Sequence, residues 1–166
     1  MAQVTLGGNP INTNGDLPAA GSAAPAFTLT KGDLSPLSAS DLAGQNVVLN
    51  IFPSIDTPTC ATSVRTFNER AAGLDNTTVV CVSADLPFAQ GRFCGAEGIE
   101  NVVTGSTFKN PEFLTDYGVL FTDGALEGLA ARAVVVIDGE GNVAHTELVS
   151  EVANEPDYDA ALSAIS

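Results

Sequence analysis

The sequence predicts an α/β fold in which one mixed β-sheet is flanked by helices. Two observations predict it. Short β-rich segments alternate with helical ones through the middle of the chain, and the last two β-rich segments flank a short polar loop, as in a hairpin. The length of 166 residues predicts that residues 1–166 form one domain, with a core large enough to fold without disulfides.

The N-terminal part is expected to contribute a hairpin and one further strand. The Gly-Gly-Asn-Pro turn signal at residues 7–10 lies between two short apolar segments, residues 4–6 and 11–13, so these should pair. Residues 27–30 alternate like a strand. Residues 34–43 should form a loop that leads into a short turn.

A strand over residues 46–52 is expected to lead into an amphipathic helix. Pro53 cannot donate a hydrogen bond to a neighbouring strand, so the strand ends there. Pro58 suits the first helical position, with Thr57 before it as the N-cap. Cys60 then lies in the first turn, where backbone N–H groups lack partners within the helix and the positive end of the helix dipole is close.

The rest of the chain continues the alternation. The expected elements are a strand at 77–83, a short helix capped by Asp85 that runs through Cys94, a short strand at 102–103, a weak helical turn at 111–117, strands at 134–137 and 143–148 joined by a hairpin loop, and a closing helix at 156–165.

The chain is strongly acidic. Six basic and twenty acidic residues give a net charge of −14, which opposes binding to nucleic acid or to an anionic membrane. The acidic residues are scattered, as expected for solubility. No apolar run approaches the length of a membrane span, and residues 1–4 lack the basic start of a signal peptide, so a soluble cytoplasmic protein is expected.

Three cysteines, Cys60, Cys81 and Cys94, do not make an even-numbered disulfide framework, and in a reducing compartment their disulfides would be transient. No two of them have C-x-x-C spacing, and the single histidine, His145, is far away in sequence. We therefore expect no metal site.

Cys60 is the candidate nucleophile, because a helix start stabilises a thiolate. The helix end supplies about 1 kcal/mol, so a nearby cation or further hydrogen bonds must add to it. The alternative is a buried structural thiol, since Cys60 shares the apolar face of its helix with Val64 and Phe67. Thr57 is either an ordinary N-cap or a hydroxyl held beside the sulfur for a substrate oxygen.

Cys94 and Cys81 differ in their surroundings. The helix that ends near Cys94 has about nine residues and contains Gly91, so it should melt locally at low cost. Cys81 lies in an apolar strand, where a structural role is expected.

Arg132 is the arginine that topology could place beside Cys60. It immediately precedes the β-rich segment 133–137, and it would reach the thiolate if that strand neighbours the strand at 46–52. Its alternative is a solvated surface arginine. Arg65 lies about 140° around the helix from Cys60 and should point away. Arg70 is a full helix length distant, and His145 is expected on a strand surface.

These residues resemble the thiol peroxidase type of peroxiredoxin, an atypical two-cysteine subfamily. The peroxiredoxin signature P-x-x-x-T-x-x-C is present as Pro53, Thr57 and Cys60, and the longer stretches 53–67, 85–96 and 131–134 are also similar. Thr59 departs from the family, which has valine there; it should face outward. The resemblance implies a thioredoxin-like fold with an N-terminal β-hairpin extension.

The same resemblance implies a function. Cys60 would be the peroxidatic cysteine and Cys94 the resolving cysteine of an intrachain disulfide. Thr57 and Arg132 would orient the peroxide, and Pro53 would support the site. Hydrogen peroxide and alkyl hydroperoxides are the implied substrates, thioredoxin or a similar dithiol the reductant, and a homodimer the assembly, without a metal or organic cofactor.

Two other functions stay open at this stage. Residues 60–63 form a C-x-x-S motif, which is also found in monothiol disulfide exchangers of the glutaredoxin type. Such exchangers resemble one another in a cis-proline before a strand near the active cysteine, where this chain has Ala131-Arg132-Ala133. The other alternative is a noncatalytic acidic binding module with Cys60 in its core.

Overall fold

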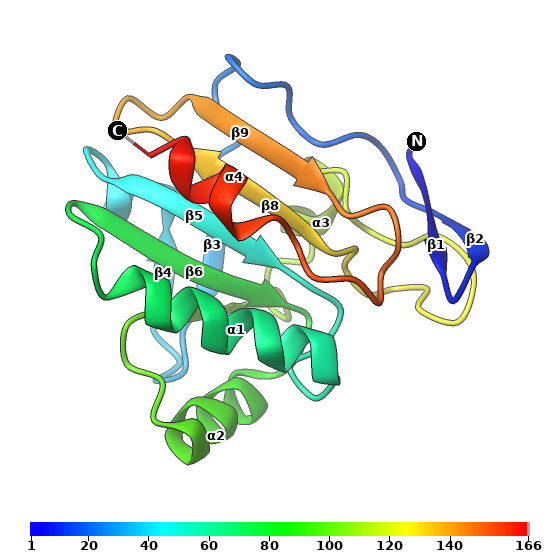
Figure 1. Cartoon of the computed structure of the whole chain (residues 1–166), viewed down its shortest axis with the longest axis horizontal. Helices are drawn as coiled ribbons and strands as arrows, with labels where there is room; N and C mark the ends of the chain where they lie inside the picture. Colours follow the sequence, from blue (N-terminus) through cyan, green and yellow to red (C-terminus); the bar gives the residue numbers. More distant parts are fainter. Residues whose placement is uncertain (166) are drawn as a thin grey trace.

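The computed structural model describes residues 1–165, and its main feature is a seven-stranded mixed sheet (Figure 1). The strand order is β4-β3-β7-β6-β5-β8-β9, in which β5, β6 and β7 run parallel and every other pairing is antiparallel. The strands are β3 (Thr28–Thr30), β4 (Pro36–Ser38), β5 (Asn46–Ile51), β6 (Thr77–Ser83), β7 (Val103–Ser106), β8 (Ala133–Ile137) and β9 (Val143–Leu148). The predicted mixed sheet flanked by helices is confirmed.

Helices cover both faces of this sheet. They are α1 (Pro58–Ala71), α2 (Pro87–Glu97), α3 (Glu112–Asp116), α4 (Tyr158–Ser163) and a short 3₁₀ helix, η1 (Ala39–Leu42). Helices α1 and α4 pack on one face, and α3 lies behind the sheet in the view of Figure 1. The central strand β5 is buried along its whole length, because its side chains alternate between two covered faces.

The N-terminal hairpin pairs β1 (Gln3–Leu6) with β2 (Asn9–Asn12). Its turn is only Gly7-Gly8, where both residues have positive φ, +58° and +84°. Two-residue hairpin turns of this kind require the conformational freedom of glycine. The four-residue turn expected at residues 7–10 is therefore too long, and Pro10 lies inside the short strand β2, opposite Thr5.

Three other boundaries differ from the expectations. Part of the loop expected at residues 34–43 pairs with β3 as strand β4, a contact between segments that local sequence does not reveal. Helix α4 is shorter than expected: it begins after Asp157, whose carboxylate accepts from the Ala160 N–H, and ends at Ser163. Strand β7 is longer than residues 102–103, because it follows the register of β6 through Ser106.

Helix α2 begins and ends differently from the prediction. Its N-cap is Leu86 rather than Asp85, and it runs three residues past Cys94 to Glu97. Gly98, with φ of +66°, ends it in a left-handed conformation, and the Gly98 N–H donates to the Cys94 carbonyl. Cys94 therefore lies in the last turn of an 11-residue helix.

The helices of residues 1–165 are all too short or too polar to cross a membrane. In the view of Figure 1 the N-terminal hairpin lies at the right, beside the loop that follows β9.

Candidate active site

Cys60 is fully buried in the first turn of α1, directly after the loop that leaves β5. Thr57 is the N-cap by backbone conformation, as predicted. Its exposed hydroxyl, however, donates to the Ser54 carbonyl at 2.9 Å rather than accepting from the first helical N–H groups. Pro53 is buried at the start of this loop. The loop thus holds the Thr57 hydroxyl by a hydrogen bond within the loop itself.

Arg132 lies beside Cys60. Strands β5 and β8 are neighbours, with Ile51 opposite Ala133, so the residue before β8 reaches the end of the loop that follows β5. Arg132 is 2% exposed, and its Nη2 donates to the Cys60 sulfur at 3.3 Å. Its Nε donates to the Val152 carbonyl at 2.7 Å.

The guanidinium is the larger electrostatic influence on the sulfur. Two opposite unit charges about 4 Å apart interact by about 4 kcal/mol at an effective dielectric constant near 20, compared with about 1 kcal/mol for a helix end. Arg132 Nη1 is buried and has no hydrogen-bond partner among the described residues. An unpaired N–H beside a sulfur is suited to bind an oxygen atom that approaches this sulfur.

Asp85 organises the loop before α1, a role that sequence reasoning missed because it assigned Asp85 to a helix cap. Its carboxylate accepts from the Ser54 hydroxyl at 2.8 Å, from the Ile55 N–H at 2.7 Å and from the Ser83 hydroxyl at 2.6 Å. Gln90 of α2 in turn donates to the Ser83 hydroxyl at 3.0 Å. The sequence did contain a signal for this role: Asp85 comes just after β6, and β6 is the parallel neighbour of β5, so the two strands end at the same edge of the sheet.

Cys94 is half-buried on α2, and burial raises the pKa of its thiol. All three cysteines are free thiols. Arg65 of α1 joins the two helices near the C-terminal end of α2. It pairs with Glu97, and its guanidinium carbon lies 5.5 Å from the centroid of the Phe93 ring. Arg65 points away from Cys60, as expected from its angle on the helix.

Cys81 lies among the core residues of the α1 face. It is fully buried, burial raises the pKa of its thiol to about 12, and the Asn50 amide approaches its sulfur at 3.7 Å. At neutral pH this thiol is protonated, which agrees with the structural role predicted for it.

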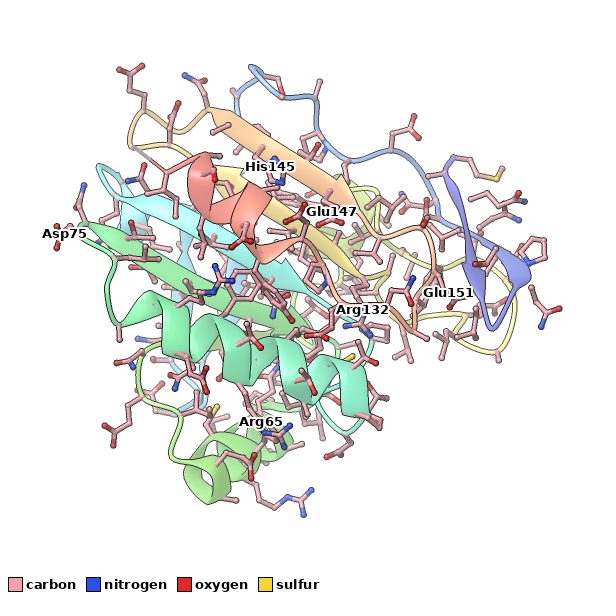
Figure 2. All side chains as sticks on the ribbon, viewed as in Figure 1. Arg65, Asp75, Arg132, His145, Glu147 and Glu151 are labelled. Atoms are coloured by element: carbon pink, nitrogen blue, oxygen red, sulfur yellow. The ribbon has the colours of Figure 1, made fainter. Side chains whose placement is uncertain are left out.

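Three remaining predictions concern polar residues around α1 and β9. Thr59 does not face outward: it is half-buried, and its hydroxyl donates to the Ala153 carbonyl at 3.0 Å. Arg70 pairs with Asp159 at 2.7 Å, at the far end of α1. His145 of β9 lies opposite Val136 of β8, away from Arg132, which precedes β8 (Figure 2).

No group of three or more His, Cys, Asp and Glu side chains within residues 1–165 is arranged to hold a metal ion. An apolar hollow of about 300 Å³ lies elsewhere, against Phe27, Val47 and Ile137. Val47 is near the start of β5, whereas Cys60 follows its end, so this hollow is not part of the site.

The model of the Redoxin family matches residues 19–162. The chain belongs to the redoxin family. Thiol peroxidases of Mycobacterium tuberculosis and Mycobacterium bovis are each 64% identical to it over 165 residues, which is 99% of this chain and 99% of each relative. Within the redoxins the chain is therefore a member of the thiol peroxidase family.

Solved structures agree with this assignment. A peroxiredoxin-like protein from Aquifex aeolicus is 40% identical, with a TM-score of 0.93 over 98% of this chain and 95% of its own. A thiol peroxidase from Chromobacterium violaceum, at 21% identity, supports the fold, with a TM-score of 0.86 over 97% and 93% of the two chains. The thioredoxin-like fold implied by the resemblance is confirmed.

The family also decides among the three activities considered from the sequence. The chain is an oxidoreductase of the peroxidase class, and its reaction is thiol-dependent peroxide reduction. It is neither a glutaredoxin-type exchanger nor a noncatalytic binding module.

Proposed function

We propose that Cys60 reduces hydrogen peroxide and organic hydroperoxides through a sulfenic acid, which Cys94 resolves as an intrachain disulfide. The observation that carries the proposal is the buried Arg132 guanidinium, with one N–H group 3.3 Å from the Cys60 sulfur and another without a partner in residues 1–165. This pair provides both a stabilised thiolate and a donor for a peroxide oxygen.

The first step transfers one oxygen. The Cys60 thiolate attacks the nearer peroxide oxygen, the O–O bond breaks, and the leaving oxygen takes a proton to become water or an alcohol. Charge develops on that leaving oxygen in the transition state. Arg132 Nη1 and the Thr57 hydroxyl would stabilise it, provided that Thr57 exchanges its present bond to Ser54 for one to the substrate.

The second step forms the disulfide. The Cys94 sulfur attacks the Cys60 sulfenic sulfur and water leaves; the disulfide is then reduced by a dithiol that is itself oxidised. A thioredoxin-type protein is the proposed dithiol. The homodimer and the absence of any cofactor, which the family resemblance implied, remain proposals of the same kind. So does the cytoplasmic location, which was expected from the composition of the sequence.

A single experiment tests the nucleophile. Stoichiometric peroxide is added to the reduced protein, which is then digested and mapped without reductant. The expected product is a disulfide between the peptides of Cys60 and Cys94.

Cys60→Ser should abolish peroxide consumption with a dithiol reductant, since serine cannot supply a thiolate, whereas Cys81→Ser should retain nearly all of it. Turnover by the Cys60→Ser protein near the wild-type rate would show that the nucleophile is another residue.

A further inference from the structure

The segment that follows β9 contacts the active site through two backbone carbonyls. The Val152 carbonyl accepts from Arg132 Nε at 2.7 Å, and the Ala153 carbonyl accepts from the Thr59 hydroxyl at 3.0 Å. Two consecutive peptide groups therefore bind the arginine and the first turn of α1, which are the two elements in contact with or containing Cys60.

The Val152 contact determines where the guanidinium points. An arginine fork is planar, so fixing Nε also fixes the directions of the N–H groups at the other two nitrogens. One of these meets the Cys60 sulfur at 3.3 Å, and Nη1 is the unpartnered donor. A displacement of the Val152 carbonyl would turn both donors away from the reacting atoms.

The same segment is held from its other side by the N-terminal hairpin. Thr5 of β1 forms a parallel bridge to it, with backbone bonds of 2.8 Å from the Thr5 N–H to the Ser150 carbonyl and from the Val152 N–H to the Thr5 carbonyl. Figure 2 shows Glu151 on the side of Arg132 that faces the hairpin.

Glu151 is the centre of this attachment. Its Oε1 accepts from the Thr5 hydroxyl and from the Gly8 N–H, both at 2.9 Å. Its Oε2 accepts from the Ala153 N–H at 3.0 Å and from the Gly7 N–H at 3.2 Å. One side chain thus joins the hairpin turn to the Val152–Ala153 peptide group, whose carbonyl accepts from Arg132 Nε.

The chemistry of these four donors requires a carboxylate. An ionised carboxylate only accepts, whereas the amide of glutamine would turn two N–H donors toward two other donors. The bonds from the Ala153 and Gly8 N–H groups are the main causes that lower the pKa of Glu151 to about 2, so the carboxylate is ionised at every ordinary assay pH.

We propose that Glu151 is a positioning residue for peroxide reduction: by fixing residues 150–153 to the N-terminal hairpin, it aims Arg132 at Cys60 and at the substrate. The proposal rests on the proposed function of Cys60 and Arg132. It makes the hairpin, which contains no reacting group, part of what determines the rate of the first chemical step.

The test compares Glu151→Gln with Thr5→Val, which removes only one of the four donors, and with Glu127→Gln as a matched control at an exposed position. Two rate constants are measured for Cys60: oxidation by peroxide, and alkylation by iodoacetamide at the alkaline plateau where the thiol is ionised. Peroxide attack needs the aimed guanidinium, whereas alkylation at the plateau needs only an accessible thiolate.

Glu151→Gln should lower the peroxide rate constant about tenfold, and Thr5→Val about threefold, because small misplacements of a catalytic group are costly. Plateau alkylation should change by less than about twofold. Glu127→Gln should match the wild type in both. If Glu151→Gln does not fold, the two rate constants of Thr5→Val by themselves test the proposal.

Two results would overturn the inference. In the first, the Glu151 and Thr5 variants oxidise Cys60 as fast as the control. In the second, oxidation and plateau alkylation fall in parallel, as expected from loosened packing alone. Failure of the proposed function looks different, because the wild-type protein itself would then give no Cys60 sulfenic acid or disulfide with peroxide.

Discussion

At the scale of single residues, the site depends on one buried cation. Arg132 is the only one of the four arginines whose side chain reaches Cys60, since Arg65 and Arg70 pair with carboxylates elsewhere and Arg92 lies on the surface near Asp56. A buried charge needs partners to offset its desolvation. The Val152 carbonyl and the Cys60 sulfur are those partners, which explains why a basic residue is tolerated beside the core.

Arg132→Gln should therefore reduce peroxide turnover while keeping a hydrogen-bond donor. We expect the rate constant with peroxide to fall at least about tenfold, which corresponds to about 1.4 kcal/mol of lost transition-state stabilisation. Arg70→Gln, which removes an exposed ion pair, is the control. Unchanged kinetics in the Arg132 variant would assign it a purely structural role.

Cys81 provides a second residue-scale prediction. Because burial raises the pKa of its thiol to about 12, the native protein keeps it protonated well above the range in which an exposed thiol ionises, near 8.5. Iodoacetamide at pH 9 should leave Cys81 unmodified in the folded protein and modify it in denaturant. Rapid modification under native conditions would show that strand β6 opens readily.

At the scale of elements, α2 is the helix that we expect to rearrange when the proposed disulfide forms. A disulfide needs Cα atoms within about 7 Å, and Cys60 and Cys94 lie on two helices that both form in the thiol state. Helix α2 has 11 residues, with only Pro87 and Gln90 buried, so local unwinding is cheap compared with global unfolding. We expect residues 87–97 to lose hydrogen-exchange protection when the disulfide forms. Equal protection in the two forms would exclude the rearrangement.

Gly91→Ala tests the same helix by stabilising it in the thiol form of the protein. A Cβ at Gly91 meets no atom within 4 Å, so the methyl group fits. Alanine should stabilise α2 by about 1 kcal/mol, which would slow disulfide formation about fivefold and prolong exposure of the Cys60 sulfenic acid to overoxidation. Gly73→Ala, outside α2 and equally open, is the control. A rate of disulfide formation that does not differ between the two variants would mean that α2 stability does not limit this step.

At the scale of the whole molecule, Glu151 connects the N-terminal hairpin to the segment that follows the last strand. Its pKa is lowered from 4.5 to about 2 in the folded protein. A lowered folded-state pKa contributes stability that is present above the unfolded value and is lost as the pH falls toward the folded one. The free energy of unfolding of the wild type should therefore exceed that of Glu151→Gln most at neutral pH.

The difference should narrow steadily below about pH 4.5. Chemical denaturation of both proteins between pH 7 and pH 3 measures it, with Glu127→Gln as the reference for removal of an exposed charge. A difference that is constant across this range would mean that the carboxylate is not held more tightly in the folded state than in the unfolded one.

The sequence by itself determined the central elements and the place of Cys60 in the first turn of its helix. Strand β6 was predicted at its observed bounds, because apolar β-branched runs carry their own signal. The start of α1 was also predicted, since Thr57-Pro58 specifies a helix start locally and thereby places Cys60 in the first turn. These are properties of a few adjacent residues, which need no information from the rest of the chain.

Only the tertiary structure decided which distant groups meet around Cys60. Arg132 is adjacent to it because β8 pairs with β5, Asp85 braces its loop because β6 is the parallel neighbour of β5, and Glu151 acts through a hairpin more than 140 residues earlier in sequence. Local patterns assigned Asp85 to a helix cap and left Glu151 unnoticed. Hydrogen bonds between segments follow from strand order and packing, which no short stretch of sequence contains.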